Sequence, residues 1–280
     1  MSALQAAKKL GLRSHSWVLL KLLDYEIPTR TLSQARTKYE KMPFEGSMCE
    51  RAYLLGLRAG DLSAERNHNL LRVATSSTRA VQIEMVRAVF GKYGHVHTYL
   101  TEYGSRPKEW RVYCDLDKSF NFLLEKTNEI PNWVLSDELC FYSFLAGYAD
   151  SEGSFNVLRA PNNRLRVTIR RASEDRAILI QMEEKLRSLG FNPRFYLDRR
   201  KNTMASYGSY KKDFYALWIS RRNDVTKLCK KLLLLSQHHG KIWMMELILS
   251  TEGKNWTDVE KDVRESRRKI KTPPSLPPFL

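Results

Sequence analysis

The stretch FLAGYADSEGSF, residues 144–155, joins an apolar, small-residue segment directly to a pair of acids and a glycine. Asp150 and Glu152 follow this segment, and no cationic residue comes before Arg159. The C-terminal end of a helix carries partial negative charge, so acids at that end are destabilising unless positive charge compensates them. The stretch therefore predicts a helix whose end has a chemical reason for holding carboxylates.

A second copy of this stretch lies earlier in the chain. Residues 50–61, ERAYLLGLRAGD, align without gaps with residues 141–152, FYSFLAGYADSE, at an offset of 91. The alignment places Asp61 opposite Glu152. Because self-similarity at a fixed offset is the signature of a repeated structural unit, the sequence predicts two related halves in one polypeptide.

The segments that follow the two copies are also similar. Each copy leads into an Arg-containing alternating stretch with a polar turn, then a helix that ends at a glycine, two strands and a closing helix. In the first half these segments are residues 62–77, 81–94, 95–103, 109–116 and 118–126, and in the second half they are residues 153–171, 174–190, 193–200, 213–220 and 224–236. The expected fold class is α+β, with a duplicated αββαββα unit.

The ends of the chain differ from the repeated core. Residues 1–45 predict a helix, a turn at Gly11, a second helix and a linker; a DNA-binding helix-turn-helix and a plain helical hairpin both fit this pattern. We expect the first half at residues 46–130, the second half at residues 131–250 and a mobile C-terminal tail at residues 251–280.

The charge of the chain is strongly positive and unevenly distributed. The net charge is +16, and residues 159–231 hold 19 Lys and Arg against 7 Asp and Glu. A protein with a basic stripe of this kind usually binds a polyanion, and nucleic acid is the first candidate. A solvated surface that only aids solubility is the alternative, but it would have more interspersed acids.

The cysteines and the apolar runs indicate the compartment. The four cysteines are widely spaced and form no CxxC pair, so we expect reduced core thiols. The N-terminus has no secretory signal pattern, and no apolar run approaches the length of a membrane span. We expect an intracellular protein of the cytoplasm or nucleoid, with an organelle as the alternative, and no membrane partner.

Small residues suggest how the two copies meet. Gly56 and Gly60 lie four residues apart in the first copy, as do Gly147 and Ser151 in the second. Side chains four apart share one face of a helix, and small residues there let two helix backbones approach closely. The copies are therefore expected to pack on each other with their acids side by side.

Two adjacent carboxylates at helix ends repel each other and oppose the helix dipoles. A divalent cation relieves both effects, and carboxylate oxygens with further water positions suit Mg²⁺, for which Mn²⁺ is expected to substitute. The metal ligands predicted from the residues are Asp61 and Glu152.

The motifs LLGLRAGDL, residues 54–62, and LAGYADSEG, residues 145–153, resemble those of the LAGLIDADG homing endonucleases in their single-chain, two-motif form. The resemblance covers roughly residues 46–250. The first motif departs from the pattern at Arg58, Ala59 and Leu62, but it keeps the acid that the family uses for metal binding.

The resemblance implies a fold, an activity and a set of site residues. It implies two antiparallel, saddle-like sheets along a DNA major groove and a monomer that cleaves double-stranded DNA at a long asymmetric site, leaving 3′ overhangs. Asp61 and Glu152 would be the catalytic metal-binding pair. The family also uses a basic residue in each half, which alignment places at Lys126 and Lys241; a plain surface cation is the alternative for each.

Arginines in and around the expected strands are the candidate DNA-binding residues, since alternate residues of a strand share a face. They are Arg66, Arg72, Arg159, Arg164, Arg166, Arg170, Arg194, Arg199 and Arg221.

Other functions of the same fold stay open. The chain would be intron-encoded or freestanding if it is an endonuclease, and an RNA maturase that assists intron splicing, with intron RNA as partner, is the main alternative. A transcription regulator of this fold would not need both acids. His95 and His97 share a strand face, but they have no third ligand at metal spacing, so no zinc site is expected there.

Overall fold

The computed structural model describes residues 3–27, 39–101, 109–205 and 208–271. The chain divides into two compact units, Met1–Glu40 and Lys41–Leu280. The larger unit holds both of the repeated halves.

The smaller unit is a pair of helices. Helices α1 (Ala3–Lys9) and α2 (His15–Asp24) pack on each other across a turn in which Gly11 has a φ of +66°. The side chain of Ser14 caps α2 by accepting a hydrogen bond of 3.2 Å from the backbone of Ser16. The helix pair predicted from the sequence is therefore present, while its role as a helix-turn-helix stays a prediction.

The first half follows the predicted order. Its elements are α4 (Met48–Ala59), β1 (Ser63–Asn67), β2 (Leu70–Ser77), α5 (Ala80–Phe90), β3 (Val96–Thr101), β4 (Glu109–Leu116) and the 3₁₀ helix η1 (Lys118–Leu123). The prediction of a closing α-helix over residues 118–126 is wrong, because this segment forms a short 3₁₀ helix. It buries Phe120 and Leu123, which lie three residues apart and so share a face at the 3₁₀ period.

The second half repeats this order and adds elements to it. After the short α6 (Asn132–Ser136) come α7 (Glu138–Glu152), β5 (Ser154–Arg159), the 3₁₀ turn η2 (Pro161–Asn163), β6 (Leu165–Ser173), α8 (Arg176–Ser188), β7 (Arg194–Arg199), β10 (Phe214–Ile219) and α9 (Arg222–Leu233). A small ribbon, β8 (Met204–Ala205) with β9 (Gly208–Ser209), separates β7 from β10, and α10 (His239–Ser250) follows α9.

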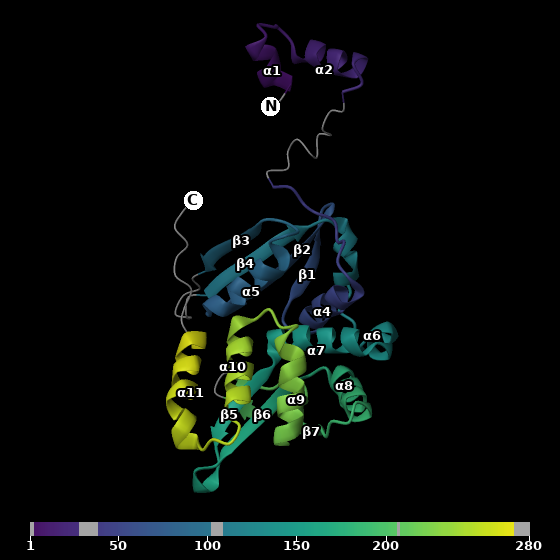
Figure 1. Cartoon of the computed structure of the whole chain (residues 1–280). Helices are drawn as coiled ribbons and strands as arrows, with labels where there is room; N and C mark the ends of the chain where they lie inside the picture. The colour runs from purple at the N-terminus through teal and green to yellow at the C-terminus, as the bar shows by residue number, and fades with distance from the viewer. Residues whose placement is uncertain (1–2, 28–38, 102–108, 206–207, 272–280) are drawn as a thin grey trace. The chain divides into compact units, whose positions relative to one another are not determined.

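Each half builds one antiparallel four-stranded sheet. The strand orders are β1-β2-β4-β3 and β5-β6-β10-β7, so β10 takes the place in the second sheet that β4 has in the first. Helix α5 packs on the first sheet, helices α8 and α9 pack on the second, and the motif helices α4 and α7 lie between the two halves (Figure 1). The predicted α+β class and the duplicated unit are confirmed.

The C-terminal segment differs from the prediction. Residues 256–271 form helix α11 (Trp256–Lys271) rather than a mobile tail. Val259 and Val263 are fully buried, and α11 contacts α10 and β5 of the second half as well as α5 of the first half. These apolar residues are one helical turn apart, so their burial against both halves stabilises the helix that the sequence analysis missed.

Within the part of the chain that the structure describes, every helix is too short or too polar to cross a bilayer.

Candidate active site and nucleic-acid interface

Two glycines set the distance between α4 and α7. A Cβ atom added at Gly56 would overlap the backbone oxygen of Phe144, and one added at Gly147 would overlap that of Tyr53. The helices therefore pack backbone against backbone, as predicted from their small residues. This close approach fixes the position of one helix end relative to the other.

The two predicted acids meet at these helix ends. Asp61 follows Gly60, the C-cap of α4, and Glu152 is the last residue of α7. The backbone N–H of Asp61 donates a 2.6 Å hydrogen bond to the hydroxyl of Ser151, and the carboxyl groups of Asp61 and Glu152 are close enough for each to shift the pKa of the other. One acid from each half thus contributes to a single site.

The environment of this acid pair favours protonation. Burial, reinforced by the charge of Asp61, raises the pKa of Glu152 to about 7. Burial also raises the pKa of Asp61, although the nearby Lys126 and Lys241 act in the opposite direction. A pair of adjacent carboxyl groups that resists double ionisation is short of positive charge, and its oxygen atoms are the ligands that hard divalent cations prefer. The donor set therefore fits a divalent metal ion.

Both predicted lysines lie beside the acid pair. The Lys126 ammonium donates a 3.3 Å hydrogen bond to the backbone oxygen of Gly60 and lies 3.7 Å from a carboxylate oxygen of Asp175. The Lys241 ammonium donates to the backbone oxygen of Gly153. Each lysine thus hydrogen-bonds to a residue next to one of the acids, although their catalytic role stays a prediction.

Burial gives Lys241 unusual acid-base properties. It lowers the pKa of this lysine to about 8, and the neighbouring Arg171 contributes in the same direction. His238 caps α10, accepting a 3.2 Å hydrogen bond from the backbone of Lys241. Burial lowers the pKa of His238 to about 3, so this imidazole is neutral at physiological pH. Of these two side chains, Lys241 is therefore the one that can change its charge near neutral pH.

Asp150 has a supporting role that the sequence analysis did not identify. Its fully buried carboxylate accepts hydrogen bonds from the hydroxyls of Tyr53 and Ser236, at 2.8 and 2.5 Å, and from the backbone of Gln237, at 2.7 Å, and His238, at 3.3 Å. These bonds hold the segment that leads into α10. Asp150 therefore fixes the position from which α10 presents its lysine to the acid pair.

A polar cavity of about 550 Å³ opens on the Asp61 side of the site. It is lined by the first sheet, the start of α5 and the start of α10; the cationic residues in its wall are Arg79, Arg111 and Lys241. Such a cavity favours an anionic group beside the acid pair.

Arg171 is a further buried residue near the site. Its guanidinium lies 5.1 Å from the centre of the Phe155 ring and donates a 3.3 Å hydrogen bond to the backbone oxygen of Arg170. Its Nε and Nη2 atoms have no hydrogen-bond partner among the described residues. Burial lowers the pKa of Arg171 to about 10. Arg171 was not predicted as a site residue, because the arginines of the strands were expected to lie on the surface.

Strand pairing divides the candidate DNA-binding arginines between two faces. Residues paired across antiparallel strands point to the same side, and alternate residues point to opposite sides. Arg66 pairs with Leu71 and Arg159 pairs with Leu165, so both lie on the helix-covered side of their sheets. Arg159 therefore lies on the opposite side of its sheet from Arg166 and Arg170.

The other strand arginines lie on the open sides of the sheets. These are Arg72 in the first sheet and Arg166, Arg170 and Arg194 in the second. Of the remaining candidates, Arg164 ends the turn η2, Arg199 ends β7 and Arg221 immediately precedes α9.

Acidic neighbours hold two of the open-side arginines. Arg72 makes a paired interaction with Asp115, at 2.8 and 2.9 Å, and Arg170 lies 2.7 Å from Asp198. Asp115 is thus the ion-pair partner of Arg72. The Arg72 guanidinium also lies 4.4 Å from the centre of the Tyr113 ring. The open sides therefore present arginines in fixed positions.

The comparison with protein families agrees with the sequence resemblance. Residues 142–232, about a third of the chain, match the family model described as a LAGLIDADG-like domain. The resemblance to this family is thereby confirmed for the second half. No curated protein matches the chain.

Several solved structures are similar to the chain. Mesophilic variants of the homing endonuclease I-DmoI are 18% identical, with 68% of this chain and 98% of that chain covered and a TM-score of 0.44. The LAGLIDADG meganuclease I-AabMI bound to uncleaved DNA is 13% identical, with 79% and 98% covered and a TM-score of 0.45. The LAGLIDADG homing endonuclease I-GzeII in complex with its DNA target is 9% identical, with 78% and 96% covered and a TM-score of 0.47.

Proposed function

We propose that the protein is a site-specific homing endonuclease that hydrolyses both strands of a DNA target with a divalent metal ion. The observation that carries this proposal is the acid pair, in which Asp61 and Glu152 meet at the ends of two packed helices and each shifts the pKa of the other. Two carboxyl groups with only a structural role would have little reason to lie together where burial disfavours their charged forms. A site for a cation and a phosphodiester accounts for it.

DNA would bind along the open sides of the two sheets. The net charge of +16 supplies the sequence-independent attraction to phosphates, which depends on salt. Arginines held in place on a strand can read base edges or phosphates at low entropic cost. Arg166, Arg170 and Arg194 lie on the open side of the second sheet, whereas Arg72 and Arg111 lie on that of the first. Because these sets differ, the target would be asymmetric. Because both halves lie in one chain, the protein would act as a monomer.

The residues of the acid pair would hold the metal ion, for which Mg²⁺ is the proposed species. When bound, the ion would supply Lewis-acid activation of a phosphodiester and lower the pKa of a water molecule. Lys241, with its pKa of about 8, can hold or release a proton at its ammonium nitrogen close to neutral pH. The cavity beside Asp61, with Arg79 and Arg111 in its wall, would orient a phosphate of the strand to be cut.

A cleavage selection tests this function. The full chain is incubated with a plasmid library of randomised and intron-insertion sites, with Mg²⁺ or with EDTA, and the cut ends are sequenced. We expect metal-dependent double-strand breaks with 3′ overhangs at one long site. The Asp61→Asn, Glu152→Gln double variant is the matched control, since it keeps the shape of both side chains.

The other outcomes of the same experiment separate the alternatives. Equal cutting by the double variant and by the wild type would remove the acid pair from the mechanism. Tight and specific binding of intron RNA, with no DNA cleavage under any metal condition, would favour an RNA maturase over the endonuclease.

A further inference from the structure

Two cysteines face each other at the opposite ends of the motif helices from the acid pair. Cys49 lies in the first turn of α4, Cys140 lies in the first turn of α7, and their sulfur atoms are 3.5 Å apart. Each cysteine comes seven residues before the glycine at which the helices touch, Gly56 or Gly147. Seven residues are about two turns, so the thiols continue the line of closest approach between the two halves.

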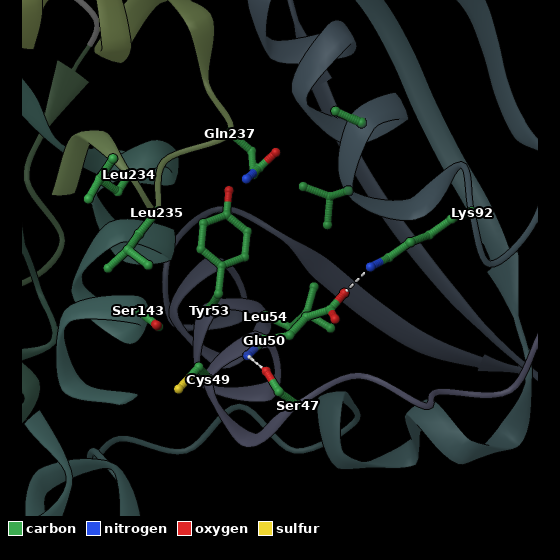
Figure 2. Close-up of a pocket in the computed structure, with 12 residues that line it drawn as sticks. Ser47, Cys49, Glu50, Tyr53, Leu54, Lys92, Ser143, Leu234, Leu235 and Gln237 are labelled. Carbon is green, nitrogen blue, oxygen red and sulfur yellow. Dashed lines mark hydrogen bonds and ion pairs between the residues drawn. The ribbon is translucent and has the colours of Figure 1, made fainter. Parts of the chain in front are cut away.

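The two thiols differ in their exposure. Cys140 is buried, whereas Cys49 is partly exposed. Figure 2 shows Cys49 at the edge of a cavity of about 340 Å³ whose wall also includes Ser143 of α7 and Leu234 and Gln237 from the segment after α9. This cavity gives a small oxidant a route to one sulfur of the pair. The other cysteines, Cys114 and Cys229, are each fully buried.

The position of the pair in the fold disfavours a bound cation. Both cysteines lie in the first turn of their helices, where the helix dipole repels cations. The carboxylate of Asp137 lies near both sulfur atoms and would complete a set of three metal ligands. It already accepts a 2.7 Å hydrogen bond from the backbone of Cys140 as the cap of α7, however, so a metal ion would compete with the cap.

We propose that Cys49 and Cys140 are a redox pair that forms a reversible disulfide between the two halves of the protein. The oxidant would be a low-molecular-weight disulfide. The Cys49 thiolate attacks one sulfur of this oxidant, which forms a mixed disulfide and releases one thiol. The Cys140 sulfur then attacks Cys49 of the mixed disulfide and releases the second thiol. The two protons lost by the protein thiols end on the two released thiols, and the oxidant takes up the two electrons.

The geometry sets both the order of these steps and the movement they need. Burial, reinforced by hydrogen bonds with its neighbours, raises the pKa of Cys140 to about 12, so the more accessible Cys49 reacts first. A disulfide needs a sulfur separation of about 2 Å, and rotation of the two side chains has to shorten the present 3.5 Å. The backbones are already held close by the glycines, so a large helix movement is unnecessary.

The cross-link would stabilise the pair of halves without changing the acid pair. It would close a loop of 91 residues between equivalent positions, which restricts the unfolded chain. The linked ends of α4 and α7 are those remote from Asp61 and Glu152. The proposal is therefore independent of the proposed nuclease function.

A thiol map after oxidation tests the proposal. The full chain is incubated with oxidised glutathione, free thiols are alkylated, and the peptides are identified by mass spectrometry without reduction. We expect one linked peptide pair containing Cys49 and Cys140, loss of two of the four thiols, and full reversal by dithiothreitol. The oxidised protein should melt at least about 5 °C higher than the reduced protein.

Variants and a metal test make the result decisive. The single variants Cys49→Ser and Cys140→Ser should show neither the linked peptides nor the oxidation-dependent rise in melting temperature. Four free thiols after oxidation, or glutathione retained on Cys49 with no linkage, would overturn the proposal. Stoichiometric Zn²⁺ binding by the reduced protein that is lost in Asp137→Asn, without disulfide formation, would assign a metal site instead.

Discussion

The two halves share a backbone plan but end their motif helices in different ways. Gly153 follows α7, and a Cβ atom at this position would overlap the guanidinium of Arg171. In the first half, the continued strand register places Leu62 opposite Thr75, in the positions that Gly153 and Arg171 occupy in the second. A larger residue after the helix thus accompanies a smaller one on the strand. The departure of the first motif from the family pattern is therefore compensated within its own half.

The charges around the two acids differ as well. Arg79 precedes α5 in the first half, whereas Asp175 has the equivalent place before α8 in the second. Asp175 adds to the rise in the pKa of Glu152, while Arg79 lines the cavity beside Asp61. Glu152 is therefore the acid whose ionisation depends more on a bound cation, and the two halves are not equivalent in their chemistry.

The largest expected effect tests what the halves have in common. Gly147→Val should destabilise the protein by at least about 4 kcal/mol, because the new side chain would meet the backbone of α4. Gly56→Val should do the same against α7. Urea unfolding measures both effects. The control Glu138→Val introduces the same side chain at an exposed position of α7 and should cost less than about 1 kcal/mol. A Gly147→Val variant as stable as this control would refute the backbone contact.

A smaller effect tests an acid for which the first half has no counterpart. Asp150→Asn removes a buried charge that accepts four hydrogen bonds and should destabilise the protein by about 3 kcal/mol. Ala59 stands at the equivalent position of the first half, so Ala59→Ser should be close to neutral. Urea unfolding measures stability, and amide hydrogen exchange of residues 236–238 reports on the loop. Unchanged exchange in Asp150→Asn would contradict its role in holding the segment before α10.

The pH dependence of stability tests the raised pKa of Glu152. The pKa of Glu152 is raised from 4.5 to about 7 in the folded state. The free energy of unfolding therefore falls as the pH rises through this range, and above about pH 7 the ionised Glu152 has its full destabilising effect. Without metal, Glu152→Gln should therefore be more stable than the wild type by about 2 kcal/mol near pH 8, and this gain should disappear by about pH 4. Added Mg²⁺ should stabilise the wild type but not the variant. The same difference in stability at both pH values would contradict the raised pKa.

The smallest effect compares the two sides of one sheet. Arg194→Ala on the open side should weaken DNA binding by about 1 kcal/mol, roughly fivefold, and reduce the salt dependence. Arg159→Ala on the helix-covered side should leave the affinity for DNA almost unchanged. Binding titrations at several salt concentrations measure both variants. Equal losses of affinity would show that strand register does not define the interface.

Much of the core fold could be predicted from the sequence because the repeat makes each half a check on the other. The glycines, the acids and most strands recur at related positions, so their common pattern outweighed local ambiguity. Lys126 and Lys241 also lie beside the acids in the structure, and their catalytic role stays a prediction. These features depend on local sequence or on the duplication itself.

The remaining features depend on long-range packing. Helix α11 is stabilised by contacts with both halves, and the role of Asp150 depends on a segment more than 80 residues away. The sides on which Arg66 and Arg159 lie follow from strand register, which composition alone does not specify. Cys49 and Cys140 were expected only to be reduced core thiols, and it is the helix packing that brings their sulfur atoms together.

The central claim is that each half supplies one acid to a shared metal site, and strand-resolved cleavage tests it most directly. Once the target is known, each of its strands is labelled and cut with Mg²⁺ by the wild type, Asp61→Asn and Glu152→Gln under single-turnover conditions. We predict that each variant cuts at least one strand about 10³-fold more slowly, while DNA binding stays within about threefold of the wild type. Cleavage of both strands at the wild-type rate by either variant would contradict the account.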